Sequence, residues 1–290
     1  MKNTSHRDSV RLSNPVDPSV IRVLRLLDPI ACSAACSYFV AGATARDLVL
    51  VNVYGLRPGR ATRDIDFGIA VESWAQFELV KERLIASRAF APAPKAQQRL
   101  IYSDPAAGFT IPVDLIPFRG IAAADGTIGW PPSRDIVMNV SGFEEALKSS
   151  VPIEVEEGLT VRVASVPGLT LLKLTAWADR GLETNKDAAD LYRLLTAYAD
   201  AGNEDRLYDQ EPDLLNSAGF DMELAGAELL GRDVAKICEV QASNKIRSLM
   251  LSDRHRERLS IDMLQFSPYP ERTPTAEEIV KVFYRGFMNA

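Results

Sequence analysis

The sequence predicts a mixed α/β domain followed by a helical domain. A short apolar stretch at 38–41 runs into Gly42 and then into further apolar residues, which indicates a strand, a turn and a helix. Alternating segments on either side of a turn at 104–108 predict a β-hairpin. Beyond residue 165 the apolar residues recur at helical spacing. The expected divisions are a flexible tail at 1–15, an α/β domain at 16–165 and a helical domain at 166–290.

Helix and strand signals alternate in the N-terminal half. Asp17 is a cap residue before Pro18 and begins a helix that extends to residue 36, in which Pro29 is expected to cause a bend or a break. Ser73 caps another amphipathic helix, at 73–88. Shorter helices are expected at 48–54 and 143–149, a Pro/Ala linker at 89–96, and strands at 38–41, 61–71, 98–102, 109–117, 128–130, 151–156 and 159–163.

The C-terminal part has helical periodicity throughout. Its expected helices lie at 169–180, 187–198, 213–215, 222–242, 243–251 and 276–288. The hydrophobic fraction of 47% and the charged fraction of 25% are ordinary for a globular enzyme. The net charge of -6 argues against a protein whose whole surface binds nucleic acid, although a local basic patch is compatible with it.

Composition also bears on the compartment. The sequence does not approach the roughly 18 uninterrupted apolar residues that a membrane span requires, and its polar N-terminus is not a secretory signal. The three cysteines show no paired metal-binding spacing. We therefore expect a cytoplasmic protein with reduced cysteines.

Two carboxylates stand one position apart in the stretch Arg63-Asp64-Ile65-Asp66-Phe67. In an extended chain, residues i and i+2 point to the same face, so Asp64 and Asp66 would lie roughly 7 Å apart at the backbone. Like charges so placed repel unless a cation lies between them, and Mg²⁺ bound by carboxylates is the common solution. The alternative is a solvent-facing position on an amphipathic strand.

A third carboxylate, Asp114, lies in the middle of the apolar run 111–117. A buried carboxylate is costly unless a cation pairs with it, which favours a place in the same site. A salt bridge to a nearby arginine or an exposed edge position are the alternatives.

The turn after the first strand is a candidate phosphate site. Gly42 would let the backbone approach a ligand closely, Thr44 offers a hydroxyl, and the N–H groups at the start of a helix favour anions. Close packing of a strand–helix turn would select the same small residues. Arg46 and Arg63 flank the region and could hold phosphates, as could Arg57 and Arg60.

Taken together, these motifs resemble the polymerase-beta-type nucleotidyltransferase superfamily, and within it the AbiEii-type group of abortive-infection and toxin–antitoxin systems. The similarity covers about residues 38–195 and includes a later helical motif, with Lys173 and Arg180 followed by Lys186-Asp187-Ala188-Ala189-Asp190. Ala41-Gly42-Ala43-Thr44 departs from the usual paired glycine form. The resemblance implies a nucleotidyltransferase-type mixed β-sheet with flanking helices and a C-terminal helical domain.

The resemblance also implies a chemistry. Two Mg²⁺ ions held by Asp64, Asp66 and Asp114 would promote transfer of a nucleoside monophosphate from an NTP to an acceptor hydroxyl. Gly42, Thr44, Arg46, Arg63 and Lys173 would contact the nucleotide, and Asp187 or Asp190 would act as an auxiliary base or an orienting group. The implied acceptor is a tRNA or a protein, and an antitoxin protein is an expected partner. A catalytically inactive nucleotide-binding or regulatory protein, and an antibiotic-type small-molecule nucleotidyltransferase, are the alternatives.

Overall fold

The structure is a computed structural model of the 290-residue chain. It describes residues 12–59, 62–94, 96–104, 106, 108–181, 184–264 and 274–290. The chain forms two compact units: the first comprises the described residues up to 123 with 128–136 and 150–164, and the second comprises 124–127, 137–149 and 165–290. Within the described ranges, no helix has the length and apolar character needed to cross a membrane.

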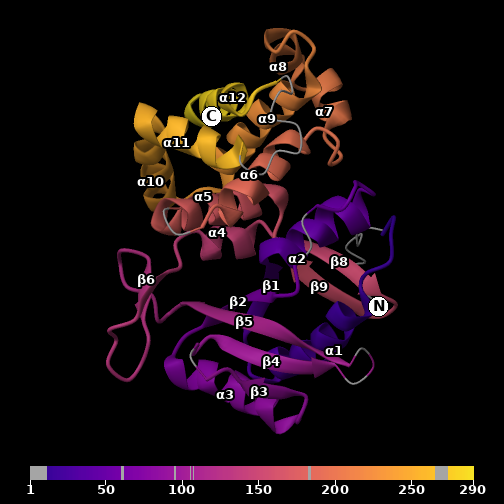
Figure 1. Cartoon of the computed structure of the whole chain (residues 1–290), viewed down its shortest axis with the longest axis vertical. Helices are drawn as coiled ribbons and strands as arrows, with labels where there is room; N and C mark the ends of the chain where they lie inside the picture. Colours follow the sequence, from indigo (N-terminus) through magenta and orange to yellow (C-terminus); the bar gives the residue numbers. More distant parts are fainter. Residues whose placement is uncertain are drawn as a thin grey trace, which may run out of the picture. The chain divides into compact units, whose positions relative to one another are not determined.

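A seven-stranded mixed sheet with the order β3-β4-β5-β2-β1-β9-β8 forms the first unit (Figure 1). The pairs β2–β5 and β1–β9 are parallel, whereas the other neighbours are antiparallel. The strands are β1 (Ser37–Ala41), β2 (Ile65–Val71), β3 (Phe90–Pro92), β4 (Arg99–Asp104), β5 (Phe109–Arg119), β8 (Val151–Glu156) and β9 (Leu159–Val163), and a separate two-stranded sheet pairs β6 (Thr127–Gly129) with β7 (Val137–Asn139). This confirms the expected mixed α/β class.

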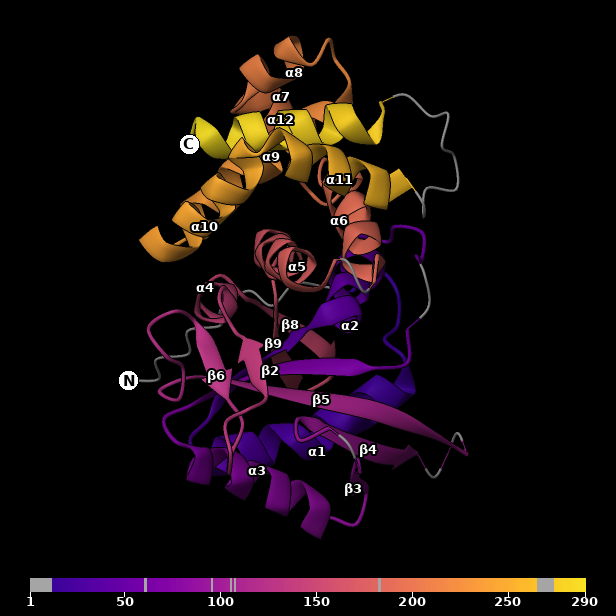
Figure 2. The same cartoon turned by 60° about the vertical axis from the view of Figure 1, so that its left-hand side comes forward.

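One face of the large sheet is covered by α1 (Pro18–Ser33) and α3 (Trp74–Ala86), which lie on the same side of it (Figure 2). Tyr38 on β1 points to this side, because its hydroxyl donates to Asp28 of α1 at 2.8 Å. Tyr38 is paired with Ile69 of β2. Since successive strand residues alternate between faces, Asp66 points to the opposite face of the sheet.

Several local expectations were wrong. The first helix is not broken at Pro29, and the apolar residues Leu27 and Ala31 on either side of it are buried, whereas the alternative of a bend stays a prediction. The turn after β1 is itself a helix, α2 (Gly42–Asp47), which continues into a π-helix, η1 (Leu48–Val53). The expected linker at 89–96 contains β3, whose Pro92 is accommodated because an edge strand can lack one hydrogen-bond donor.

The expected tail at 1–15 lies largely outside the described residues. At its end, the backbone N–H groups of Ser13 and Asn14 both donate to the carbonyl oxygen of Asn52, and the Ser13 hydroxyl donates to the carbonyl oxygen of Val53. Residues 13–15 are therefore attached to η1 rather than loose.

Helices make up most of the second unit. They are α4 (Phe143–Lys148), α5 (Val166–Arg180), α6 (Lys186–Thr196), α7 (Glu204–Asp209), α8 (Pro212–Ser217), α9 (Met222–Ile237), α10 (Val240–Leu251), α11 (Asp253–Leu264) and α12 (Ala276–Met288). The expected helix at 222–242 ends at Ile237, and α10 begins at Val240. The backbones of α9 and α12 approach so closely that a Cβ at Gly231 or Gly286 would overlap the facing main chain.

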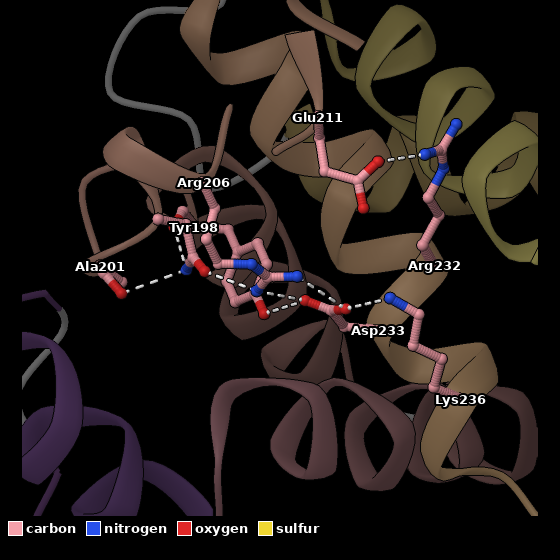
Figure 3. A network of polar contacts seen from close by, with 8 residues as sticks. Tyr198, Ala201, Arg206, Glu211, Arg232, Asp233 and Lys236 are labelled. Carbon is pink, nitrogen blue, oxygen red and sulfur yellow. Dashed lines mark hydrogen bonds and ion pairs between the residues drawn. The ribbon is translucent and has the colours of Figure 1, made fainter. Parts of the chain in front are cut away.

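A polar network fixes the segment after α6 against α9 (Figure 3). The Tyr198 hydroxyl and Nη1 of Arg206 donate to Oδ2 of Asp233 at 2.7 and 2.8 Å, and Lys236 pairs with the same carboxylate at 3.2 Å. Burial raises the pKa of Tyr198 above its ordinary value, and the nearby Asp233 charge adds to this. The network thus combines a neutral phenol with paired charges, and we assign it to packing of the helices.

Candidate active site

The paired strands β2 and β5 place two of the predicted carboxylates next to each other. Their parallel register pairs Asp66 with Asp114. Directly paired residues share a face of the sheet, and neighbouring strands lie about 4.8 Å apart. Like charges in such a position destabilise the pair unless a cation neutralises them. This part of the sheet therefore requires a positive charge close to Asp66 and Asp114.

A guanidinium that the sequence analysis did not select supplies a positive charge. Arg99 of β4 is paired with Asp114 of β5, and its Nε and Nη2 atoms donate to the two carboxylate oxygens of Asp114, both at 2.7 Å. Its Nη2 atom also lies 4.0 Å from the carboxylate of Asp64. The hydrogen bonds to Asp114 raise the pKa of Arg99 above its ordinary value, and the charges of the aspartates add to this. Asp64 and Asp114 thus converge on one arginine.

Arg99 could have been found only through the register of the β4–β5 hairpin. A register shift of one residue would move Arg99 to the other face of the sheet. The sequence signal is the alternation of Arg99-Leu100-Ile101-Tyr102, and it indicates a strand without fixing its partner position.

The turn glycine lies directly against the carboxylate row, the name used here for Asp64, Asp66 and Asp114. Ala41 is paired with Asp66, and Gly42 follows with a φ of +62°, a conformation that costs energy for residues with a Cβ. A Cβ at Gly42 would also overlap the Asp66 carboxylate. Position 42 therefore needs glycine for its backbone conformation and for the close approach of Asp66.

The hydroxyl of Thr44 is used inside the protein. Its Oγ1 atom donates to the backbone carbonyl of Asp64 at 3.1 Å, and the residue is buried. Its proton is therefore used inside the protein, and the expected nucleotide contact of Thr44 stays a prediction. Thr44 instead connects α2 to the segment that carries Asp64.

The flanking arginines differ from each other in exposure. The side chain of Arg46 is only 2% exposed and binds Asp47 through Nε at 2.9 Å and Nη2 at 2.8 Å. The guanidinium of Arg46 is therefore paired in the interior, and its expected nucleotide contact stays a prediction. Arg63 and Arg57 are exposed, whereas Arg60 lies outside the described residues. Arg63 adjoins Asp64 and stays a candidate for binding an anion.

The later helical motif forms a second charge cluster, within the helical unit. Lys173 of α5 binds Asp187 at 3.0 Å and Asp190 at 2.6 Å, both at the start of α6. Arg180 also binds Asp187, at 2.8 Å. Lys173 is 15% exposed, and both aspartates are buried. The amine expected to contact a triphosphate is thus bound to two carboxylates.

The pKa shifts in this cluster follow from its ion pairs. Burial by itself would raise the pKa of Asp187, but the hydrogen bond from Arg180 and the charge of Lys173 lower it overall. Burial would lower the pKa of Lys173, and the charges of Asp190 and Asp187 raise it overall. An aspartate with a lowered pKa is a poor proton acceptor, so Asp187 is suited to orienting its neighbours rather than to acting as a base.

The three aspartates of the sheet provide hard oxygen ligands of the kind that Mg²⁺ prefers. Across the described residues, no three or more His, Cys, Asp and Glu side chains are already arranged to hold a metal ion. At Asp114, both carboxylate oxygens accept hydrogen bonds from Arg99. The chemistry of the donor set nevertheless fits a divalent cation, because the carboxylates of Asp64 and Asp114 already converge on one positive charge, that of Arg99.

A mixed sheet whose neighbouring strands present paired aspartates beside a glycine turn has the architecture of a nucleotidyltransferase. The chain belongs to the AbiEii family, whose model, described as nucleotidyl transferase AbiEii toxin of a type IV toxin–antitoxin system, matches residues 25–274. The match extends beyond the stretch 38–195 on which the sequence resemblance was based. The expected family and the expected enzyme class are both confirmed.

Comparison with solved structures gives more distant similarities. The solution structure of the antibiotic-resistance factor ANT(2'')-Ia has 14% sequence identity and a TM-score of 0.38, covering 70% of this chain and 96% of that protein. The CCA-adding enzyme of Thermotoga maritima, solved with tRNA, has 15% identity and a TM-score of 0.25, covering 94% and 80%. The CdnE c-di-GMP synthase of Capnocytophaga granulosa has 12% identity and a TM-score of 0.28, covering 95% and 82%. No curated protein matches the sequence.

Proposed function

We propose that this nucleotidyltransferase moves a nucleoside monophosphate from an NTP to a hydroxyl of a tRNA or a protein, releases pyrophosphate, and requires Mg²⁺. The observation that carries the proposal is the register of Asp66 with Asp114, next to Gly42. A reaction of this kind depends on positioning and on neutralising phosphate charge, and paired carboxylates beside a glycine are suited to both.

In this proposal Asp64, Asp66 and Asp114 hold the metal ions. When bound, Mg²⁺ would supply positive charge that stabilises the attacking and leaving oxygens. Gly42 leaves room for Asp66, and Thr44 fixes the backbone of Asp64. Exposed Arg63 would attract the anionic substrate.

We assign the second charge cluster to positioning. The pairs of Lys173 with Asp187 and Asp190 fix α5 against the start of α6. Each carboxylate is matched by a nearby cation, which favours an orienting role over a proton-transfer role.

Family membership supports a biological role as well. A toxin of a type IV toxin–antitoxin system acts on a cellular target, so we extend the proposal to growth inhibition in the cytoplasm that an antitoxin protein opposes. Production of the wild-type chain should arrest growth, and production of Asp66→Asn should not. Equal growth of the two strains would contradict the toxin role.

The direct test is label transfer. The purified protein, Mg²⁺ and each α-labelled NTP are incubated with a cell extract, purified tRNA or an aminoglycoside, and the labelled product is identified. We expect label in tRNA or protein with the wild type, and at least a ~1,000-fold loss with Asp66→Asn, because a carboxylate that holds the metal is removed.

The matched control is Asp28→Asn. Asp28 is an aspartate of the same unit that binds Tyr38 on the opposite face of the sheet, so this variant should transfer label at the wild-type rate. Label on the aminoglycoside alone would favour the small-molecule alternative. NTP binding by titration calorimetry without pyrophosphate release on any acceptor would favour a regulatory protein.

A further inference from the structure

Arg99 is built into the carboxylate row by the fold itself. It lies on β4 directly opposite Asp114 of β5, so the hairpin that forms the sheet also brings the two side chains together. Two nitrogen atoms of Arg99 donate to the two carboxylate oxygens of Asp114, and this bidentate arrangement is the strongest common geometry for a guanidinium and a carboxylate. The side chain of Arg99 is 34% exposed and that of Asp114 is largely buried.

The same guanidinium also reaches Asp64, whose carboxylate is 4.0 Å from Nη2. Arg99 therefore occupies the electrostatic position that a bound divalent cation would take with respect to these two aspartates. A carboxylate whose two oxygens bind an arginine has fewer lone pairs in the correct direction for a metal. The positive charge of the arginine also repels a cation a few ångströms away.

We propose that Arg99 is an intrinsic counter-ion that competes with the divalent metal for Asp114 and Asp64, and that the metal site forms only when this guanidinium gives way. The inference rests on the proposed metal-dependent function and deepens it by naming a residue that regulates the site. Arg99 is thus a positioning residue: it keeps the carboxylates together without metal and lowers their affinity for metal.

Arg22 and Asp104 provide a matched pair for comparison. Arg22 of α1 binds Asp104 at the end of β4 at 2.6 Å, and its side chain is 31% exposed, close to the exposure of Arg99. Arg22→Met removes a similar ion pair from the same unit. It leaves the carboxylate row unchanged, so it reports the general cost of losing an arginine–aspartate pair.

The test measures Mn²⁺ binding to the full chain by the loss of the electron paramagnetic resonance signal of free Mn²⁺. Mn²⁺ is the probe because it shares the preference of Mg²⁺ for carboxylate oxygens. We expect Arg99→Met to bind Mn²⁺ at least about 10-fold more tightly than the wild type, since a unit positive charge near the metal is removed. Arg99→Lys, which keeps the charge but loses the fork geometry, should lie between them. Arg22→Met should bind like the wild type.

Thermal unfolding gives a second readout. In EDTA, Arg99→Met should melt below the wild type, because Asp64 and Asp114 then lose the guanidinium that faces them, and Mn²⁺ should raise its melting temperature more than that of the wild type. Arg22→Met should be destabilised equally with and without Mn²⁺. If Arg99→Met is unfolded in EDTA, its refolding on addition of Mn²⁺ would support the proposal. The affinity of Arg99→Lys for Mn²⁺ is then the deciding measurement, and an affinity no higher than that of the wild type would overturn the proposal.

The outcomes separate this inference from the proposed function. If the wild type binds Mn²⁺ and Arg99→Met binds it no more tightly, the competition is overturned and the metal-dependent function stays in place. Absence of Mn²⁺ binding by both chains would overturn the metal requirement together with the competition. Binding by Arg99→Met alone would support competition in its strongest form.

Discussion

The carboxylate row of the sheet and the ion-pair cluster of the helical unit differ in how the charges of their aspartates are neutralised. In the row, Asp64 and Asp114 both face the guanidinium of Arg99, Asp66 is paired with Asp114 across the strands, and the side chain of Asp64 is 49% exposed. In the cluster, Asp187 and Asp190 are buried and matched by Lys173 and Arg180. The row places two carboxylates on one arginine at a partly exposed position, whereas the cluster matches two buried carboxylates with two cations.

In the proposed function, this difference separates a cation-binding site from a cluster that stabilises the fold. An excess of carboxylates at an accessible position attracts a metal ion, and the metal ion then supplies the positive charge that the protein lacks there. A balanced buried cluster has no such requirement. Removal of one of its members leaves an uncompensated charge in the interior, which is far more costly than loss of a surface pair.

The largest effect is expected from Lys173→Met. Two buried carboxylates lose the amine that binds both, and we expect the free energy of unfolding to fall by about 3–5 kcal/mol. Urea unfolding measures the loss, and hydrogen exchange of peptides from α5 and α6 locates it. The control is Lys148→Met, which removes an exposed pair with Glu239 and should leave the free energy of unfolding close to that of the wild type. Equal stability of the two variants would remove the distinction between a buried cluster and a surface pair.

An intermediate effect is expected from Gly42→Ala. The positive φ should cost about 1–3 kcal/mol of stability, and the new Cβ displaces the Asp66 carboxylate, so label transfer should also be lost. The control is Gly158→Ala, where φ is +77° and the space around the Cβ is open. Gly158→Ala should lower the free energy of unfolding in urea, because of its positive φ, and should still transfer label. Transfer by Gly42→Ala at the wild-type rate would argue against the placement of Asp66 by this glycine.

The smallest effect is expected from acidification. Because the pKa of Asp187 is lowered in the folded state, its contribution to stability is complete above its unfolded pKa of about 3.9 and is lost as the pH falls through the folded value. Hydrogen exchange of α6 should therefore accelerate below about pH 4, beyond the change caused by exchange chemistry. Asp187→Asn should lose this acid dependence. The raised pKa of Lys173 predicts a matching loss only above about pH 10.4.

The sequence alone predicted the sheet strands that carry the acids and the glycine turn, because both leave a local pattern. It could not assign Arg99, since the pairing of Arg99 with Asp114 depends on hairpin register, which the residues of the turn at 104–108 do not determine. For the same reason the alternative of a salt bridge from Asp114 to an arginine could be stated but not resolved.

Packing decides which partners two of the predicted phosphate-binding side chains meet within the chain. Thr44 and Arg46 have side chains suited to phosphate binding, but in the folded chain they bind Asp64 and Asp47. Side-chain type indicates what a residue can bond to, and only the packing decides which partner it meets. The helix α11 was missed because its polar sequence has weak apolar periodicity, although it contributes buried residues such as Leu259 and Met263.

The two units are interleaved along the chain, because the second takes residues 124–127 and 137–149 from within the stretch that otherwise builds the first. A cut near residue 164 would therefore leave α4 attached to the wrong fragment, separated from α5, against which it packs. Neither half is a transferable module. An exchange of segments between members of the family would have to keep residues 124–127 and 137–149 together with 165–290, and a deletion that separates them should cause misfolding.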